Sequence, residues 1–331
     1  MKKAAILLGK DSHDRIYPPS VLHKMSAMCE VIAKGTPAEI PQLADGLAEV
    51  EVLFTGWGAP CLDEKTLRFF PNLKLVLYGA GSLKNVVTDT FWTRNLPICS
   101  AWMANAVPVA EFTFAQIILS LKQVHCMPGL MRESQGKAVP PHLEEGGAYG
   151  TTVALISLGV IGRKVAELLK LLDVQVLAFD PYCAPGSAAS LGVELVSLEE
   201  AFSRARVVSL HTPWLKETEG MITGNLLDSI PQGGTFINTA RGAVVNEKEM
   251  IGVLQNRPDL SAVLDVTYPE PPEKNSPLYT LPNVFLTPHI AGSIHGECGR
   301  MGEYMVEECR RWISGGKLKY QISKTAFEKM A

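Results

Sequence analysis

One stretch, residues 151–181, limits what the chain can fold into. It opens with an apolar, β-branched run at 152–158, passes through a glycine turn, and then shows apolar residues at helical spacing over 164–172. A second apolar run, 174–179, leads directly to Asp180. A strand, a helix and a second strand in this order predict a βαβ unit with two parallel strands.

The turn of this unit carries Gly159 and Gly162, and the helix that follows begins with unpaired backbone N–H groups. Such a helix end attracts the pyrophosphate of a dinucleotide, and glycine permits the close approach. Asp180 ends the next strand, where a carboxylate binds the adenine-ribose hydroxyls and repels a 2′-phosphate. No arginine stands beside Asp180 in the sequence, so the unit predicts NAD rather than NADP. Ser157 replaces the first glycine of the usual pattern.

Composition narrows the class of protein. The chain has 331 residues, of which 47% are hydrophobic and 20% charged, as is typical of a folded two-domain protein. A formal net charge of −3 without a basic block argues against binding to nucleic acid or to an anionic membrane. We expect no signal peptide and no membrane span, because the long apolar segment 104–121 contains Pro108 and Glu111. Seven scattered cysteines without a C-x-x-C pair predict reduced thiols, a cytoplasmic protein and no metal site.

Before the βαβ unit, short apolar runs at 3–8, 50–54 and 73–78 predict strands, with a helical pattern at 62–70. This alternation predicts a small parallel sheet. A glycine-rich turn at 79–81 follows the third strand and offers N–H donors to an anion such as a carboxylate. A plain turn is the alternative interpretation.

Three further segments are expected around the two sheets. Residues 104–123 predict a long apolar helix that connects two domains, and the polar segment 129–150 predicts an exposed loop or arm. Residues 295–313 predict an amphipathic helix that packs back on the first domain.

After the βαβ unit the chain again alternates between strands and helices. The clearest helix, 246–255, has Asn246 as its N-cap and Glu249 in position for an approximate capping box. Four more strands bring the second sheet to six, the number in a complete doubly wound sheet. These strands are predicted at 206–210, 235–238, 261–265 and 284–286.

Three ionisable residues follow strand ends in the second sheet: Arg241, Glu270 and His289. The carboxyl ends of parallel strands meet at one edge, so these side chains are expected to face one crevice. A surface arginine, a solvated glutamate and a helix-capping histidine explain each residue taken alone. Their coincidence beside a dinucleotide site favours an active site.

These motifs resemble those of the D-isomer-specific 2-hydroxyacid dehydrogenase family over residues 73–292, with order and spacing kept. The matching motifs are SLGVIG with Asp180, SLHTP (209–213), NTARGAVV (238–245), DVTYPEPP (265–272) and TPHIAG (287–292). The resemblance implies an α/β fold in which a Rossmann-type NAD-binding domain is inserted into a smaller flavodoxin-like substrate domain. The NAD-binding domain would comprise residues 103–292, and the substrate domain residues 1–102 plus 293–331.

The resemblance also implies an NAD-dependent oxidoreductase that interconverts a D-2-hydroxy acid and a 2-oxo acid. His289 would be the acid and base, and Glu270 would hold it protonated and oriented. Arg241 would bind the substrate carboxylate and polarise its carbonyl, with the backbone at Ala80 and Gly81 on the other side of that carboxylate. The cofactor would be held by Gly159, Val160, Ile161, Gly162, Asp180, Thr212, Pro213, Thr239, Ala240, Asp265 and Gly292.

The family resemblance further implies a homodimer built through the nucleotide-binding domains. Three alternatives stay open from sequence. One is an NAD-sensing binding protein of the C-terminal-binding corepressor type, although those proteins carry extra terminal segments. Another is an adenosylhomocysteine hydrolase, although that family is longer and lacks the Arg/Glu/His spacing. The third is a formate- or phosphite-oxidising dehydrogenase of the same fold.

Overall fold

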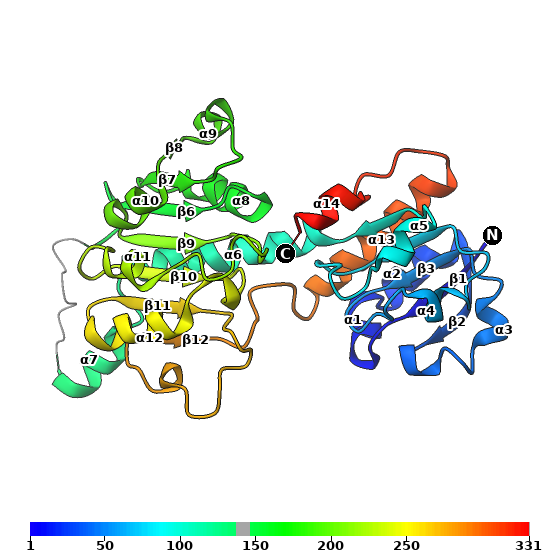
Figure 1. Cartoon of the computed structure of the whole chain (residues 1–331), viewed down its shortest axis with the longest axis horizontal. Helices are drawn as coiled ribbons and strands as arrows, with labels where there is room; N and C mark the ends of the chain where they lie inside the picture. Colours follow the sequence, from blue (N-terminus) through cyan, green and yellow to red (C-terminus); the bar gives the residue numbers. More distant parts are fainter. Residues whose placement is uncertain (137–145, 331) are drawn as a thin grey trace. The chain divides into compact units, whose positions relative to one another are not determined.

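The computed structural model describes residues 1–136 and 146–330, and the chain divides into two compact units (Figure 1). Unit 1 comprises residues 1–106 and 293–331, and unit 2 comprises residues 107–292. Each unit is built around one parallel sheet, which confirms the predicted α/β class. All seven cysteines are free thiols, as predicted.

Unit 2 contains a sheet of seven parallel strands. From one edge to the other these are β12 (Val284–Leu286), β11 (Ser261–Leu264), β10 (Thr235–Asn238), β9 (Val207–Leu210), β6 (Thr152–Ile156), β7 (Gln175–Phe179) and β8 (Val193–Leu195). The strand order reverses at β6, because β7 and β8 follow on one side of it and β9 to β12 on the other. The carboxyl ends of β6 and β9 therefore mark the topological switch point of a doubly wound sheet. All six predicted strands are present. The predicted count of six is wrong by one, because the short edge strand β8 carries too little apolar pattern to stand out in the sequence.

Helices cover both faces of this sheet (Figure 1). One face packs against α10 (Leu198–Arg204), α11 (Gly224–Asp228) and α12 (Glu247–Asn256). The other packs against α6 (Trp102–Leu121), α8 (Val160–Leu169) and α9 (Pro185–Leu191). Alternate strand residues therefore enter two separate cores, as the continuous apolar runs of buried parallel strands require.

Three local predictions for unit 2 need correction. Helix α8 begins at Val160 rather than at residue 164, because Gly159 is already its N-cap. Asn246 caps α12 by accepting from the N–H of Glu249 (3.2 Å), but the Glu249 carboxylate accepts from the N–H of Gly224 (2.7 Å), so the capping box is not reciprocal. The expected loop at 129–150 overlaps α7 (Met127–Ser134), and its residues 137–145 lie outside the described residues.

Unit 1 contains five parallel strands. Their order is β2 (Cys29–Gly35), β1 (Lys2–Leu7), β3 (Val52–Thr55), β4 (Leu75–Tyr78) and β5 (Ile98–Ser100). This is the flavodoxin-like order that the resemblance implies. The sequence analysis does not predict β2 and β5, because β2 is polar at most of its exposed positions and β5 has only three residues.

Two groups of helices enclose the sheet of unit 1. One face packs against α1 (His13–Ile16), α2 (Pro19–Ser26) and α13 (Glu297–Ile313). The other packs against α3 (Ala44–Leu47), α4 (Glu64–Leu67), α5 (Asp89–Thr93) and α14 (Lys324–Glu328). The C-terminal segment thus belongs to the same core as the first strands of the chain.

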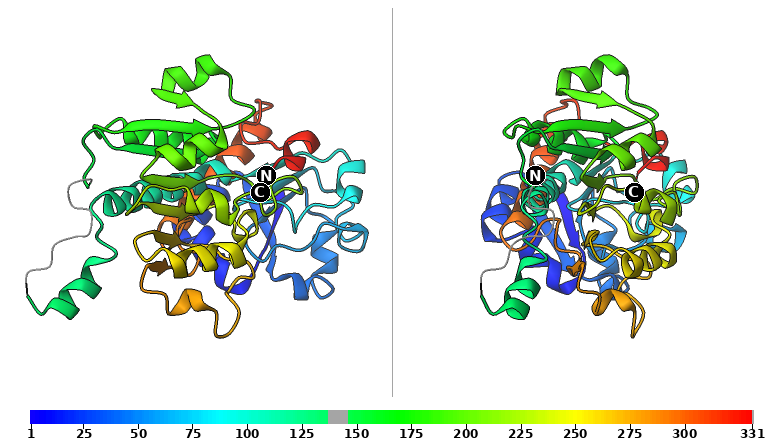
Figure 2. Two further views of the ribbon diagram at one scale, coloured as in Figure 1. Left: turned by 60° about the vertical axis from the view of Figure 1, so that its left-hand side comes forward. Right: turned by 90° about the vertical axis from the view of Figure 1, so that its left-hand side faces the viewer.

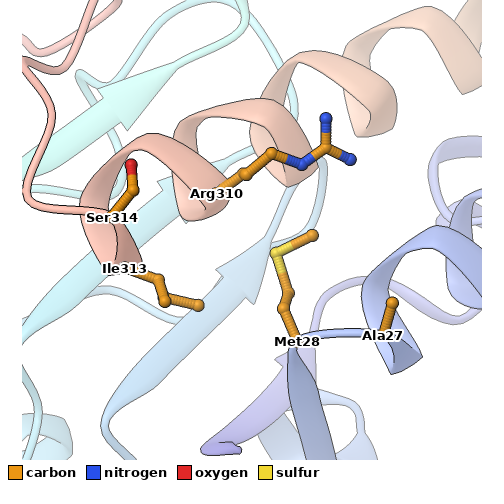
Figure 3. Close-up of a pocket in the computed structure, with 5 residues that line it drawn as sticks. All are labelled: Ala27, Met28, Arg310, Ile313 and Ser314. Carbon is orange, nitrogen blue, oxygen red and sulfur yellow. The ribbon is translucent and has the colours of Figure 1, made fainter.

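A pocket of about 250 Å³ opens on unit 1 where α2 and α13 end (Figure 3). Its lining is mostly apolar and contains none of the residues predicted to bind substrate or cofactor. The lining residues are Ala27, Met28, Arg310, Ile313 and Ser314.

Helix α6 is the one segment among the described residues that is long and apolar enough to cross a membrane. Of its most apolar window, 56% is buried inside the protein. Buried core helices can be equally long and apolar, so the length and composition of α6 are only weak evidence for a membrane span.

A buried carboxylate fastens the C-terminal segment to unit 1. Glu308 of α13 is fully buried and forms an ion pair with Arg311. Its Oε2 atom accepts from the N–H groups of Lys319 (2.8 Å) and Tyr320 (2.9 Å), and the thiol of Cys99 lies 3.4 Å away. Since the N–H groups of Lys319 and Tyr320 both bond to this one carboxylate, its removal should loosen the C-terminal segment.

We expect Glu308→Ala to lower the free energy of unfolding by about 3 kcal/mol, because it leaves two N–H groups without an acceptor and removes the buried partner of Arg311. The neighbouring Glu307 forms only partly exposed ion pairs with Arg310 and Arg311, so Glu307→Ala should cost less than about 1 kcal/mol. Urea unfolding of the two variants measures the difference. Equal losses would show that Glu308 does not anchor the segment.

Candidate active site

The glycine turn lies between β6 and α8. A Cβ on Gly162 would clash with the carbonyl oxygen of Ser157, so only glycine fits there. A Cβ on Gly159 would meet nothing nearer than the Ser157 hydroxyl at 3.8 Å. Val160 and Ile161 form the first turn of α8, which has no acidic side chain, and their N–H groups are among the unpaired donors. The turn therefore fits a pyrophosphate.

Asp180 follows β7 and also holds the glycine turn in place. Its Oδ2 accepts from the N–H of Leu158 (2.7 Å) and lies 3.5 Å from the Ser157 hydroxyl, while its Oδ1 accepts from the N–H of Tyr182 (2.8 Å). Carboxylate oxygens accept more than one bond each, so capacity for ribose hydroxyls is left. Ser157 has a φ of +83°, in the region that favours the glycine it replaces.

The motif at 209–213 lies beneath this turn. His211 is buried, its Nε2 lies 3.1 Å from the Ser209 hydroxyl, and its Cδ2 would be 3.6 Å from a Cβ on Gly162. Burial lowers the pKa of His211 to about 3, so the ring is neutral and adds no charge beneath the turn. The Thr212 hydroxyl donates to the carbonyl of Ile156 (3.3 Å). The sequence analysis gives His211 no role of its own.

Pro213 ends the same motif. Its carbonyl accepts from the Thr218 hydroxyl (2.6 Å), which also accepts from the N–H of Leu215 (2.9 Å). These bonds fix the loop that leaves the carboxyl end of β9. Thr212 and Pro213 therefore lie at the same edge of the sheet as the glycine turn, which is consistent with their predicted place along the cofactor.

The three predicted catalytic residues follow neighbouring strands. Arg241 follows β10, Glu270 follows β11 and His289 follows β12. The Nδ1 atom of His289 lies 2.6 Å from Oε1 of Glu270, and since a carboxylate only accepts, Nδ1 carries the proton. The two side chains are 48% and 41% exposed, and the His289 Nε2 atom bonds to no described residue. The pair can therefore exchange protons with a bound molecule.

Arg241 differs from this pair in its burial. Burial lowers the pKa of the Arg241 guanidinium, an effect that the nearby charge of Glu270 partly offsets. Its Nη1 donates to the carbonyl of Ala240 (2.6 Å), and Nε and Nη2 donate to no described residue. A partly buried guanidinium with free donors is suited to a two-pronged contact with a carboxylate.

The turn before Arg241 is built by its own motif. The side chain of Asn238 accepts from the N–H of Ala240 (3.0 Å) and donates to the carbonyl of Arg241 (3.1 Å). The Thr239 hydroxyl lies 3.0 Å from that of Thr113 on α6. Asn238 and Thr113 are positioning residues that the sequence analysis missed, although an asparagine at a strand end is a signal for such a turn.

Gly242 brings the Arg241 turn against the Glu270 loop. A Cβ at this position would clash with the peptide between Thr267 and Tyr268. The backbones of the two segments are therefore in direct contact, which explains how two loops from different strands keep Arg241 and Glu270 in a fixed relation.

Asp265 is predicted to bind the nicotinamide end of the cofactor, but its visible partners are within the protein. It is 1% exposed. Its oxygens accept from the Thr287 hydroxyl (2.6 Å) and from the N–H groups of Ile290 (2.8 Å) and Ala291 (2.9 Å), while its carbonyl accepts from the N–H of His289 (3.0 Å). Asp265 thus shapes the loop of His289, which ends at the predicted cofactor residue Gly292.

Ala80 and Gly81 belong to unit 1, where they follow β4. The Ser100 hydroxyl bonds to their carbonyl oxygens, at 2.8 Å and 2.6 Å. Their N–H groups have no acceptor among the described residues, and the Asn105 amide nitrogen would lie 3.7 Å from a Cβ on Gly81. Asn105 is itself oriented by the N–H of Ser293 (2.9 Å). This turn fits an anion, while its role toward the substrate stays a prediction.

The structure brings Arg241, Glu270 and His289 to one edge of the sheet in unit 2, and the glycine turn and Asp180 to the switch point of the same sheet. Within residues 1–136 and 146–330, no group of three or more His, Cys, Asp or Glu side chains is placed to hold a metal ion.

Comparison with known proteins identifies related sequences. A family model described as the NAD binding domain of D-isomer specific 2-hydroxyacid dehydrogenases matches residues 114–291. D-3-phosphoglycerate dehydrogenase of Mycobacterium tuberculosis is 32% identical over 257 residues, 78% of this chain and 48% of that protein. The chain thus spans about half the length of the curated phosphoglycerate dehydrogenases it matches. (S)-sulfolactate dehydrogenase of Chromohalobacter salexigens is 31% identical over 76% of this chain and 81% of that protein.

Solved structures show the same fold. The D-isomer specific 2-hydroxyacid dehydrogenase of Lactobacillus delbrueckii ssp. bulgaricus, in its NAD complexed form, matches with a TM-score of 0.80. The match covers 97% of this chain and all of that one at 22% sequence identity.

The buried His211 makes a testable contribution to acid sensitivity. An unfolded histidine takes up a proton near pH 6.5, whereas the folded His211 does so only near pH 3, so stability falls as the pH drops below about 6.5. Between pH 7 and pH 5 the parent should lose about 2 kcal/mol more of its free energy of unfolding than His211→Gln. Urea unfolding at both pH values measures this.

The exposed His23 provides the matched control. Between pH 7 and pH 5, His23→Gln should lose as much of its free energy of unfolding as the parent does. If His211→Gln also follows the parent, the buried ring is not the acid-sensitive group.

Proposed function

We propose that this chain, which belongs to the D-isomer-specific 2-hydroxyacid dehydrogenase family and carries its NAD-binding domain in unit 2, interconverts a D-2-hydroxy acid and a 2-oxo acid. One observation carries the proposal. The hydrogen-bonded pair of His289 and Glu270 lies at the same sheet edge as the partly buried Arg241, whose guanidinium has free donors.

Reduction of a 2-oxo acid needs a hydride at the carbonyl carbon and a proton at the carbonyl oxygen. NADH, when bound, supplies the hydride. His289 supplies the proton: Nδ1–H stays bonded to Glu270, and Nε2 points its own N–H to the oxygen that becomes the hydroxyl. In the opposite direction Nε2 accepts the hydroxyl proton, and the carboxylate of Glu270 stabilises the imidazolium that results.

Arg241 binds the substrate carboxylate through its fork of donors and draws electron density from the adjacent carbonyl. Its partial burial supports this role. A partly desolvated guanidinium whose own hydrogen bond goes only to the carbonyl of Ala240 gains more from an incoming carboxylate than a fully solvated one would. Substrate binding and carbonyl polarisation then depend on the same side chain.

NADH should be preferred to NADPH, because Asp180 places a negative charge where the adenine ribose binds. The remaining cofactor contacts are proposed as predicted, with one change of role. Asp265 acts on the nicotinamide end chiefly by shaping the His289 loop, since it is buried and accepts three hydrogen bonds from that loop.

A cytoplasmic location and a homodimer complete the proposal. Seven free cysteines suit a reducing compartment. Helix α7 extends away from the sheet of unit 2 in both views of Figure 2 and exposes Met131, while His125 before it contacts the half-exposed Phe285 of the edge strand β12. We assign this segment to contact with a second copy of the chain.

The catalytic assignment predicts three different kinetic defects. His289→Ala should lower kcat by on the order of 10² or more, with cofactor affinity little changed. Glu270→Gln keeps the shape but removes the charge, so oxo-acid reduction should fail at a lower pH than in the parent. Arg241→Lys should mainly raise KM for the oxo acid, because an ammonium cannot make the two-pronged contact. NADH oxidation with a panel of 2-oxo acids measures all three.

A panel that includes formate and phosphite with NAD distinguishes the related chemistries. Turnover of formate or phosphite, without turnover of any 2-oxo acid, would overturn the proposal. A pH profile of kcat/KM that is unchanged in Glu270→Gln would show that the carboxylate does not act on the imidazole.

The homodimer predicts a sedimentation coefficient above that of a 36.0 kDa monomer at micromolar concentration. Met131→Asp places a charge on α7 and should shift the protein toward the monomer, because a buried unpaired charge is costly. Leu171 is 75% exposed beyond the end of α8, so Leu171→Asp is the matched control and should leave the dimer intact. A parent that sediments only as a monomer contradicts the dimer.

A further inference from the structure

An arginine reaches the Asp180 turn from another element. Arg163 lies on α8, and its Nη1 donates to the hydroxyl of Ser187 (2.8 Å) while its Nη2 lies 3.5 Å from Sγ of Cys183. The N–H of Cys183 in turn bonds to the carbonyl of Asp180 (3.4 Å). The guanidinium is therefore held at the loop that begins at Asp180, although no arginine is next to Asp180 in the sequence.

The charge of Arg163 is not neutralised at this position. Across the described ranges 1–136 and 146–330, no carboxylate comes within ion-pair distance of it. Its two partners are a hydroxyl and a thiol, neutral groups that a phosphate can displace. The side chain is neither fully buried nor fully exposed, so it is held by the loop and still reachable from solvent.

Asp180 carries the opposite charge at the same loop. The N–H groups of Leu158 and Tyr182 hold its carboxylate in place (2.7 Å and 2.8 Å). A carboxylate at this position binds ribose hydroxyls and repels a 2′-phosphate, whereas a nearby arginine accommodates that phosphate. The loop that begins at Asp180 thus has a carboxylate that opposes NADP and, held against it from α8, a guanidinium that would accept the 2′-phosphate.

We propose that Arg163 is a second residue that determines cofactor choice. Asp180 excludes the 2′-phosphate of NADP(H) in the parent protein, and Arg163 binds that phosphate once the Asp180 charge is removed. This inference rests on the proposed function only in that unit 2 binds the adenosine half of NAD, and it does not depend on which acid is the substrate. Removal of the single negative charge of Asp180 would then shift the preference from NAD toward NADP.

The experiment measures binding rather than turnover. The probes are 2′,5′-ADP, which carries the 2′-phosphate, and 5′-ADP, which lacks it, each titrated by calorimetry. Asp180→Asn should tighten 2′,5′-ADP by on the order of tenfold, because the amide keeps an oxygen for the turn but has no charge. Adding Arg163→Gln to that variant should abolish the gain, and within the Asp180→Asn background 5′-ADP should bind with similar affinity whether or not Arg163 is present.

Lys164→Gln in the Asp180→Asn background is the matched control, because it removes one positive charge from the next position on α8, turned about 100° away. It should keep most of the gain for 2′,5′-ADP. Asp180→Ser provides a second background if the asparagine disturbs the turn. Equal affinity for 2′,5′-ADP with and without Arg163, in both backgrounds, overturns the proposal.

Failure of the proposed function is a separate result. A parent that binds 5′-ADP but reduces no 2-oxo acid refutes the proposed function and leaves the role of Arg163 intact. A parent that reduces 2-oxo acids, with Asp180 variants whose gain for 2′,5′-ADP survives Arg163→Gln, refutes only the role of Arg163.

Discussion

The buried carboxylate of Asp265 holds together the edge of the sheet on which the proposed catalytic residues depend. A buried anion is costly unless its oxygens are satisfied, and here the segment from Thr287 to Ala291 satisfies them. Because the loop must curl around Asp265 to do so, His289 takes a φ of +54° and its imidazole meets Glu270. The direction of the imidazole of His289, the proposed proton donor, is thus set by a residue that need not touch a substrate.

The charged residues proposed to act in catalysis differ in their exposure to solvent. Arg241 is partly buried, which strengthens the attraction of its charge for a carboxylate. His289 and Glu270 are roughly half exposed, so the protons they handle can be exchanged with solvent between turnovers. If Arg241 were as exposed as the pair, water would screen its proposed contact with a substrate carboxylate more strongly.

The sequence allowed both parallel sheets to be predicted, and the gathering of Arg241, Glu270 and His289 at one sheet edge, because buried parallel strands are apolar runs and their carboxyl ends share one edge. It did not reveal β8 and β5, which have three residues each, or α7, whose polar residues read as a loop. The contacts of Arg163 with Cys183 and Ser187 could not be predicted from the sequence either, because only the packing of α8 brings these segments together. Asp265 was assigned to the cofactor because a motif shows that a carboxylate is present, not what it bonds to.

The glycine turn shows why one position of a motif tolerates substitution and another does not. Position 157 requires a positive φ, and serine adopts it at a cost of roughly 1–2 kcal/mol. Its N–H bonds to the carbonyl of Phe179 (2.8 Å) and its hydroxyl lies near Asp180, which offsets part of that cost. Position 162 requires the absence of a side chain, because any Cβ would clash with the backbone of Ser157 itself. The conformational requirement can be met by another residue, whereas the steric one cannot, so the turn keeps its shape with serine at its first position.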